Sequence, residues 1–206
     1  GLALIGMQAE VQSSATPDQL AGVLDALKRM CSAPTFAGYL TLVIGENGLA
    51  LAREHGLTPS LKVGNWIGPV LVAAAEHGAK ELLLLGYHGK LVKLAGGIFH
   101  THHHLADGRL EVLTALGVRA GLTSQQLQLV LESASVEAAL QGLSAQAPDA
   151  AQRLWLLLAR TVEDRSQAYI ARYGDWSIRI SAALFDRARV IRWRGVCAER
   201  FFTLMD

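Results

Sequence analysis

The sequence has little of what several classes of protein require. It contains only two cysteines, Cys31 and Cys197, which excludes a disulfide framework and favours a reducing cytoplasm. Nineteen basic residues face 18 acidic ones, and the net charge of +1 gives no basic excess for non-specific nucleic-acid binding. The longest apolar runs, such as Val70–Ala75 and Leu154–Ala159, are far below the roughly 20 residues of a membrane span. We therefore expect neither nucleic acid nor membrane as a partner.

The sequence does have enough apolar residues to fold. Of its 206 residues, 51% are hydrophobic and 18% are charged, which excludes global disorder and suits one domain, with or without a short appendage. The chain starts at Gly1 instead of Met, and the apolar run Leu2–Ile5 already has the pattern of a strand. We expect a piece of a longer protein.

Predicted strands alternate with helices in the first half of the chain. Strands are predicted at residues 2–5, 39–44, 61–63 and 81–85, and helices at 17–30, around 49–55, up to 77 and over 90–99. This alternation predicts an α/β fold with a small parallel sheet of about four strands flanked by helices. After Asp107 the pattern becomes helical, and residues 176–184 and 190–193 then alternate like a C-terminal β-hairpin. We predict an α/β domain over 1–174 and a hairpin segment over 175–206.

Three glycines follow predicted strands directly. Gly45, Gly64 and Gly86 open turns that gather at the carboxyl edge of a parallel sheet, where ligands bind, although tight turns alone also need glycine. Residues 86–90 (GYHGK) are too short for a P-loop, and no G-x-G-x-x-G is present. Nucleotide hydrolysis by a P-loop and dinucleotide binding are therefore not expected.

Several basic residues lie near the third of these turns. Lys90 and Lys93 share a helix face and suit carboxylates or phosphates, or are solvated surface lysines. His88, predicted within the turn, suits acid–base chemistry or a structural role. These alternatives stay open at the level of the residues alone.

Histidines are densest in residues 99–109 (FHTHHHLADGR). Four histidines in five residues invite a zinc site, but adjacent side chains such as His103 and His104 do not converge easily on one ion. Asp107 is either a helix N-cap or a partner of Arg109, and Arg109 is a carboxylate ligand or one half of an ion pair.

Residues 86–113 (GYHGKLVKLAGGIFHTHHHLADGRLEVL) carry a specific resemblance. They closely resemble the segment H-x-G-K-L-x-K-x-A-x-G-x-F-x-T-H-x-x-x-A-D-x-R-x-E of the cobalt-precorrin-5B methyltransferase family (CbiD), and the resemblance extends from Gly1 to about Asp186. It implies S-adenosylmethionine-dependent methylation of carbon 1 of cobalt-precorrin-5B, giving cobalt-precorrin-6A in anaerobic cobalamin biosynthesis. Cobalt then belongs to the substrate, and no protein metal site is implied.

The resemblance also implies roles and partners. The acidic macrocycle is one partner. Another is a missing N-terminal α+β region of the same enzyme, on which residues 175–206 would pack; a homo-oligomer is left open. The implied catalytic residues are His88, His102 and Asp107. Substrate binding is assigned to Lys90, Lys93, Thr101 and Arg109. Cofactor binding is assigned to Gly45, Glu46, Asn47, Gly48, Gly64, Asn65, Gly86 and Gly89.

The chain departs from the family pattern at two places. His103 follows Thr101-His102 where the family has serine, and Met7–Val11 replaces a small glycine-containing loop. Two other functions therefore stay open: a non-catalytic corrinoid-binding or scaffold piece and, less favoured, a zinc-dependent hydrolase that uses the histidine cluster.

Overall fold

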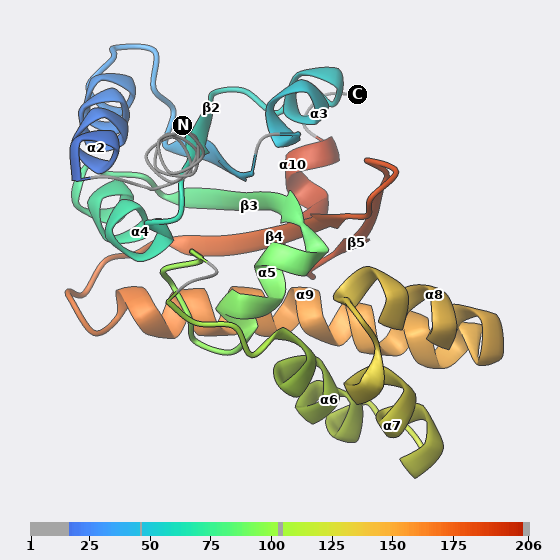
Figure 1. The fold of residues 1–206 in the computed structure, drawn as a ribbon. Helices are drawn as coiled ribbons and strands as arrows, with labels where there is room; N and C mark the ends of the chain where they lie inside the picture. Colours follow the sequence, from blue (N-terminus) through green and yellow to red (C-terminus); the bar gives the residue numbers. More distant parts are fainter. Residues whose placement is uncertain (1–16, 46, 103–104, 204–206) are drawn as a thin grey trace, which may run out of the picture.

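The fold is built on one five-stranded sheet. The computed structural model describes residues 17–45, 47–102 and 105–203. The strands follow the order β2-β1-β3-β4-β5 (Figure 1). Neighbours among β1 to β4 are parallel, and β5 is antiparallel to β4. This arrangement confirms the predicted α/β class. The strands are β1 (Tyr39–Ile44), β2 (Ser60–Val63), β3 (Glu81–Tyr87), β4 (Arg179–Phe185) and β5 (Ile191–Arg194).

Helices cover both faces of the sheet. One face carries α2 (Pro17–Cys31), α4 (Ile67–Glu76), α5 (His88–Ala95) and the long α9 (Pro148–Ile170), and the other carries α3 (Gly48–Glu54) and α10 (Glu199–Thr203) (Figure 1). The side chains of β3 show why two layers form. Leu82 and Leu84 enter the larger core, whereas Leu83 and Leu85 enter the smaller one. Successive strand residues point to opposite faces, so an all-apolar strand requires cover on both.

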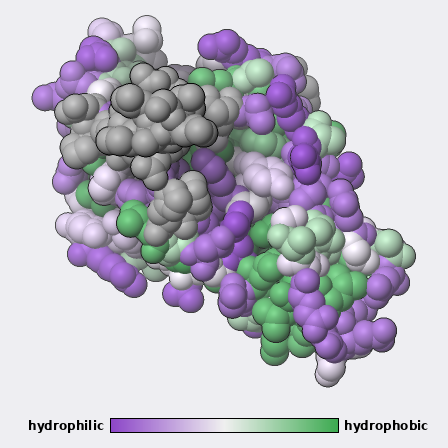
Figure 2. Space-filling model, viewed as in Figure 1, coloured by the Kyte–Doolittle hydropathy of each residue, from purple (hydrophilic) through white to green (hydrophobic). Residues whose placement is uncertain are grey.

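Three further helices form a second layer beneath α5 and α9. They are α6 (Arg109–Arg119), α7 (Ser124–Glu132) and α8 (Val136–Gln146), and α6 and α8 pack against both α5 and α9. Thr123 begins α7 with a capping box, which satisfies two backbone N–H groups. Hydrophobic residues gather on the surface of this layer (Figure 2), where Val118 and Leu131 are exposed.

The predicted turn at residues 86–89 does not form. Strand β3 runs through Gly86 to Tyr87, and α5 begins at His88 without an intervening loop. A Cβ at Gly86 would lie 3.1 Å from Leu91 and 3.2 Å from Ile44, so the missing side chain lets α5 turn back directly over the strand end. His88 is therefore the first residue of a helix instead of a turn residue.

The predicted C-terminal hairpin is part of the main sheet. Strand β4 pairs with β3 along all seven residues from Arg179 to Phe185, so it supplies a fourth parallel strand. The strand predicted at residues 2–5 lies outside the described residues. Residues 179–194 share the sheet and its cores with the preceding residues, and their packing on a missing N-terminal region stays a prediction.

Two smaller observations bear on the composition. Both cysteines are free thiols. None of the helices in the described part of the chain combines the length and the apolar character needed to cross a membrane.

Candidate functional site

A crevice lies over the carboxyl ends of β1, β3 and β4. From β1 the chain passes first to β2 on one side and then to β3 on the other, so the direction of strand order reverses between β1 and β3. Ligands of open α/β sheets bind at such a reversal. Here a cavity of about 480 Å³ is lined from β1 by Ile44, Gly45 and Asn47, and from β3 and β4 by Tyr87 and Phe185. Its volume is in the range of small-molecule sites.

Two groups of predicted residues meet in this crevice. Gly45 and Asn47 were predicted to bind the methyl donor and Lys90 the substrate, and all three line the cavity. Gly45 has φ of +101°, a conformation that side chains disfavour, and a Cβ there would lie 4.0 Å from Lys90. Arg189 donates to the amide oxygen of Asn47 over 3.1 Å. Glu46 lies outside the described residues.

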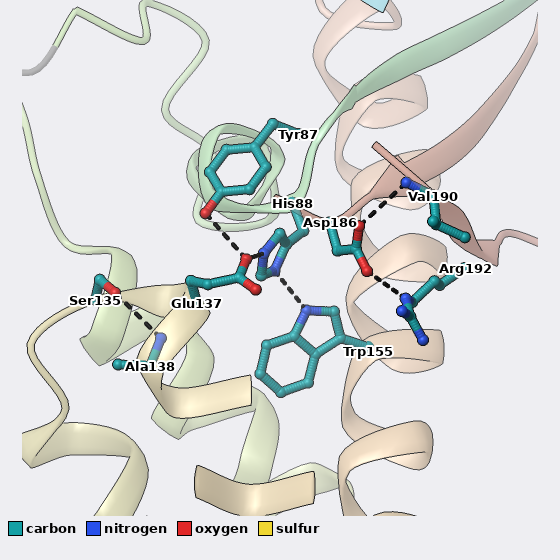
Figure 3. A network of polar contacts seen from close by, with 9 residues as sticks. All are labelled: Tyr87, His88, Ser135, Glu137, Ala138, Trp155, Asp186, Val190 and Arg192. Carbon is teal, nitrogen blue, oxygen red and sulfur yellow. Dashed lines mark hydrogen bonds and ion pairs between the residues drawn. The ribbon is translucent and has the colours of Figure 1, made fainter. Parts of the chain in front are cut away.

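A buried hydrogen-bonded chain ends at the crevice on Glu137 (Figure 3). The indole N–H of Trp155 donates to Nδ1 of His88 over 2.8 Å, and Nε2 of His88 lies 2.7 Å from Oε2 of Glu137. The hydroxyl of Tyr87 donates to the same carboxylate oxygen over 3.2 Å. Three residues from β3, α5 and α9 thus fix the carboxylate that α8 supplies. Burial, followed by the charge of Glu137, raises the pKa of Tyr87 to about 12.

The partners of His88 define its protonation. An indole N–H only donates, so Nδ1 of His88 carries a lone pair and Nε2 carries the hydrogen that goes to Glu137. The side chain of His88 is fully buried, and burial lowers its pKa although Glu137 opposes the shift. Both nitrogens are engaged inside the protein. This geometry favours a positioning role for His88, and its predicted role in catalysis stays a prediction.

Asp186 forms a second acidic wall of the crevice. It directly follows β4, and its carboxylate accepts the backbone N–H of Val190 over 3.1 Å and a hydrogen bond from Nε of Arg192. Asp186 is buried, and the exposed Arg187 and Arg189 flank the same cavity. The β4–β5 connection therefore supplies one fixed anion and two cations to the crevice.

A second cavity adjoins the first. It measures about 650 Å³ and is lined by Gln141 and Gln152 from α8 and α9, by Trp193 from β5, and by Glu137 and Asp186. Those two carboxylates line both cavities. The arrangement offers two ligands adjoining sites with a common acidic wall.

The motif segment forms a different cluster. The hydroxyl and the backbone N–H of Thr101 donate to the side-chain and backbone oxygens of Asn65 over 3.2 and 2.9 Å. Lys93 is 3% exposed and donates to the carbonyls of Thr101 and Ala106 over 3.3 and 2.6 Å, and burial lowers its pKa. These contacts hold the loop after α5 in place. Substrate contact by Lys93 and Thr101 stays a prediction, and the observed contacts favour a positioning role for both.

Asp107 and Arg109 form a bidentate ion pair in the same segment. Nε and Nη2 of Arg109 donate to the two carboxylate oxygens over 2.7 and 2.6 Å. Hydrogen bonding to Arg109 lowers the pKa of Asp107 to about 2. The pairing with Arg109 predicted for Asp107 is observed. Gly108, not Asp107, is the N-cap of α6, although Asp107 also accepts the backbone N–H of Arg109 over 3.3 Å at the start of that helix. Arg109 lies close enough to Tyr87, which lines the crevice, for its positive charge to act on the pKa of that hydroxyl.

Two of the other predicted glycines, Gly48 and Gly89, serve packing. A Cβ at Gly48 would lie 2.3 Å from Val43, and one at Gly89 would lie 2.5 Å from the Tyr87 ring. Gly89 thus lets Tyr87 lie over the first turn of α5. Gly64 follows β2 next to Asn65 and does not line the crevice.

His102 lies near the Asn65 cluster. It is partly exposed, with its ring 6.5 Å from that of His100. Across the residues that the structure describes, no three His, Cys, Asp or Glu side chains come together as metal ligands would. His103 and His104 lie outside that part of the chain.

Sequence reasoning missed most of the crevice. Glu137, Trp155 and Asp186 were not selected, and neither were Arg187 and Arg189. One signal was available for the last three, because they directly follow a strand that proves to be parallel. Glu137 and Trp155 stand in ordinary amphipathic helices and carry no such signal.

Comparison with known proteins finds similarity to one family. Residues 100–196 match the family model described as CbiD, C-terminal domain. A curated protein of Parasynechococcus marenigrum (strain WH8102), named cobalt-precorrin-5B C(1)-methyltransferase, is 68% identical over 207 residues, which cover 100% of this chain and 58% of the relative. The chain is thus similar to the CbiD family over residues 100–196 and to this relative over its whole length.

Other relatives bear the same name. The protein of that name from Synechococcus sp. (strain CC9902) is 68% identical over 100% of this chain and 57% of its own length. That of Prochlorococcus marinus (strain MIT 9303) is 64% identical over 95% of this chain and 51% of its own length. The chain thus spans between half and three fifths of these relatives. No solved structure gives a significant match.

Proposed function

We propose that the protein containing this chain transfers a methyl group from S-adenosylmethionine to carbon 1 of cobalt-precorrin-5B, giving cobalt-precorrin-6A. The observation that carries the proposal is the pair of adjoining cavities with a common wall of Glu137 and Asp186. Methyl transfer needs two ligands side by side, and the curated relatives are named for this reaction. The cytoplasm is the proposed location.

The crevice residues fit a methyl donor of this kind. S-adenosylmethionine combines a purine, a ribose and a charged amino acid. The crevice offers the rings of Tyr87 and Phe185, the carboxylate of Glu137, and the cations Arg187 and Arg189. The donor supplies an electrophilic methyl group on a sulfonium. The macrocycle carbon gives the electron pair of the new C–C bond, and the C–S pair returns to sulfur.

The contribution of the chain is chiefly alignment. Holding a nucleophilic carbon and a methyl group in line replaces a bimolecular encounter by a nearly intramolecular step. The buried contacts of His88, Trp155 and Asp186 give the common wall a fixed geometry. Lys90 at the crevice and Arg109 near it place positive charge where it suits the carboxylates at the edge of the macrocycle. Cobalt enters only as part of the substrate.

Binding of the demethylated donor tests the proposal. We expect S-adenosylhomocysteine to bind the full-length protein with a measurable heat in calorimetry, with or without corrinoid. The full-length protein should also convert cobalt-precorrin-5B to a methylated product. Absence of binding under both conditions would contradict the proposal, and binding of the macrocycle without methyl transfer would indicate a scaffold.

A further inference from the structure

Only one of the two carboxylate oxygens of Glu137 accepts hydrogen bonds from the described residues. Its Oε2 receives both Tyr87 and His88, while Oε1 receives no hydrogen bond from any residue in the described ranges. The side chain is 13% exposed and lines both cavities. One oxygen is therefore held in place, and the other remains as an acceptor at the place where the two cavities meet.

Helix stability alone does not account for this arrangement. Glu137 stands in the first turn of α8, where an acidic side chain interacts favourably with the helix dipole, and Ser135 already caps the helix by accepting from Ala138 over 3.1 Å. This interaction with the helix dipole does not require a hydrogen-bond partner for the carboxylate. Two side chains from other elements nevertheless converge on a single oxygen.

The hydrogen-bonded chain has a fixed direction. Trp155 can only donate, so His88 must donate from Nε2, and Oε2 of Glu137 must accept (Figure 3). All three members are buried or nearly so. The chain keeps a carboxylate in one orientation without neutralising it, because His88 stays uncharged in this tautomer.

The surroundings of Glu137 indicate the kind of group it accepts from. The centroids of the Tyr87 and Phe185 rings lie 6.3 Å apart at the same cavity and suit a planar base, while Arg187 and Arg189 suit a carboxylate. A carboxylate next to a base platform fits the vicinal hydroxyls of a ribose. Resting on the proposed function, we propose that Glu137 binds the ribose hydroxyls of the methyl donor, and that His88 and Trp155 are positioning residues that orient it.

Nucleoside probes separate this proposal from its rivals. In the full-length protein we expect E137Q to weaken S-adenosylhomocysteine and 5′-methylthioadenosine alike, by about tenfold or more. The 2′-deoxy form of 5′-methylthioadenosine should bind the wild type more weakly than 5′-methylthioadenosine does. On E137Q the two nucleosides should bind with equal affinity. E111Q is the matched control, because Glu111 is an exposed acid in the first turn of α6, and it should leave both affinities unchanged.

Each other outcome has a defined meaning. If E137Q weakens S-adenosylhomocysteine but not 5′-methylthioadenosine, the carboxylate binds the amino group, and the ribose assignment is overturned. Unchanged affinity for both probes overturns any ligand contact by Glu137. If wild type binds neither probe, the proposed function itself fails, and the ribose assignment fails with it.

The positioning role has its own test. Trp155→Phe keeps an aromatic ring but removes the donor to His88, so we expect several-fold weaker probe binding and a new pH dependence of affinity as Nδ1 becomes free to take a proton. A purely structural role predicts a lower melting temperature with unchanged affinity and pH profile. Nitrogen NMR of the wild type adds a readout that needs no variant: His88 should be the Nε2–H tautomer between pH 7 and 8, and an Nδ1–H tautomer would overturn the proposal.

Discussion

The crevice and the motif segment differ in how their polar groups are used. In the segment from Lys93 to Arg109, the polar groups satisfy one another: Lys93 binds backbone carbonyls, Thr101 binds Asn65, and Asp107 binds Arg109. In the crevice, Glu137 keeps a carboxylate oxygen without a donor from the described chain.

The difference teaches that a dense motif and a ligand contact need not coincide. Buried polar groups require hydrogen-bond partners, so a segment that holds a loop in place needs polar residues that bind one another. A ligand instead supplies the missing partner at its own site. Residues that position the loop thus carry much of the recognisable pattern, whereas the crevice joins His88 and Lys90 of that pattern to isolated residues on other elements.

Replacing the two lysines separately gives the largest expected contrast. Lys93→Ala removes the donor from two carbonyls of the loop and leaves a cavity, so we expect the free energy of unfolding to fall by about 2 kcal/mol or more. Lys90→Ala changes a half-buried residue at the crevice, so it should cost less stability than Lys93→Ala while weakening the binding of a carboxylate-bearing corrinoid such as cobyrinic acid. Chemical denaturation and calorimetry measure both. Equal stability losses would remove the distinction between the regions.

A pair of glycine variants gives the second largest expected effect. Gly45 and Gly78 have φ of +101° and +86°, so substitution by alanine should cost each about 1 to 2 kcal/mol of stability. Only Gly45 lines the crevice, and only Gly45→Ala should also weaken S-adenosylhomocysteine. Loss of affinity in both variants, measured by calorimetry, would mean that the effect is general strain.

The ion pair of the motif segment should contribute little to stability. The side chains of Arg109 and Asp107 are 40% and 47% exposed, so Asp107→Asn should lower the stability at pH 7 by no more than about 1 kcal/mol. The sign of the pH effect is fixed. The pKa of Asp107 in the folded state is about 2, below its unfolded value. Its contribution is therefore present above about pH 4 and is lost as the pH falls toward 2. Denaturation curves at pH 7 and pH 3 should differ more for wild type than for the variant, and an identical pH dependence would contradict the pairing.

The smallest expected effect is an absence of pH dependence at the crevice. Burial lowers the pKa of His88 below its ordinary value of 6.5, so this imidazole should stay neutral between pH 7 and 8. Affinity for S-adenosylhomocysteine should accordingly be flat across that range in calorimetry. A step in affinity that disappears in His88→Gln would restore His88 as a titrating group.

Much of the fold could be predicted because its signals are local. The apolar runs of β1 and β3, the period of α2 and the alternation of β4 and β5 each lie within a few residues of sequence. The position of β4 could not be predicted, because pairing β3 with a strand some ninety residues later depends on tertiary contacts. The turn after β3 was predicted wrongly because Gly86 serves helix packing instead of a loop.

Part of the candidate site could likewise be predicted from the sequence, and part could not. Gly45 and Asn47 follow the end of β1, and Lys90 follows the end of β3, so their convergence at the carboxyl edge of the parallel sheet was foreseeable. Glu137 and Trp155 reach the site only because α8 and α9 pack beneath α5, which local patterns do not encode.

A structure of the full-length protein with S-adenosylhomocysteine tests the central claim most directly. We predict that the nucleoside lies in the crevice between Gly45 and Asp186, with its ribose hydroxyls within hydrogen-bond distance of Oε1 of Glu137. A nucleoside bound instead against Thr101 and Arg109, away from Glu137, would contradict the claim.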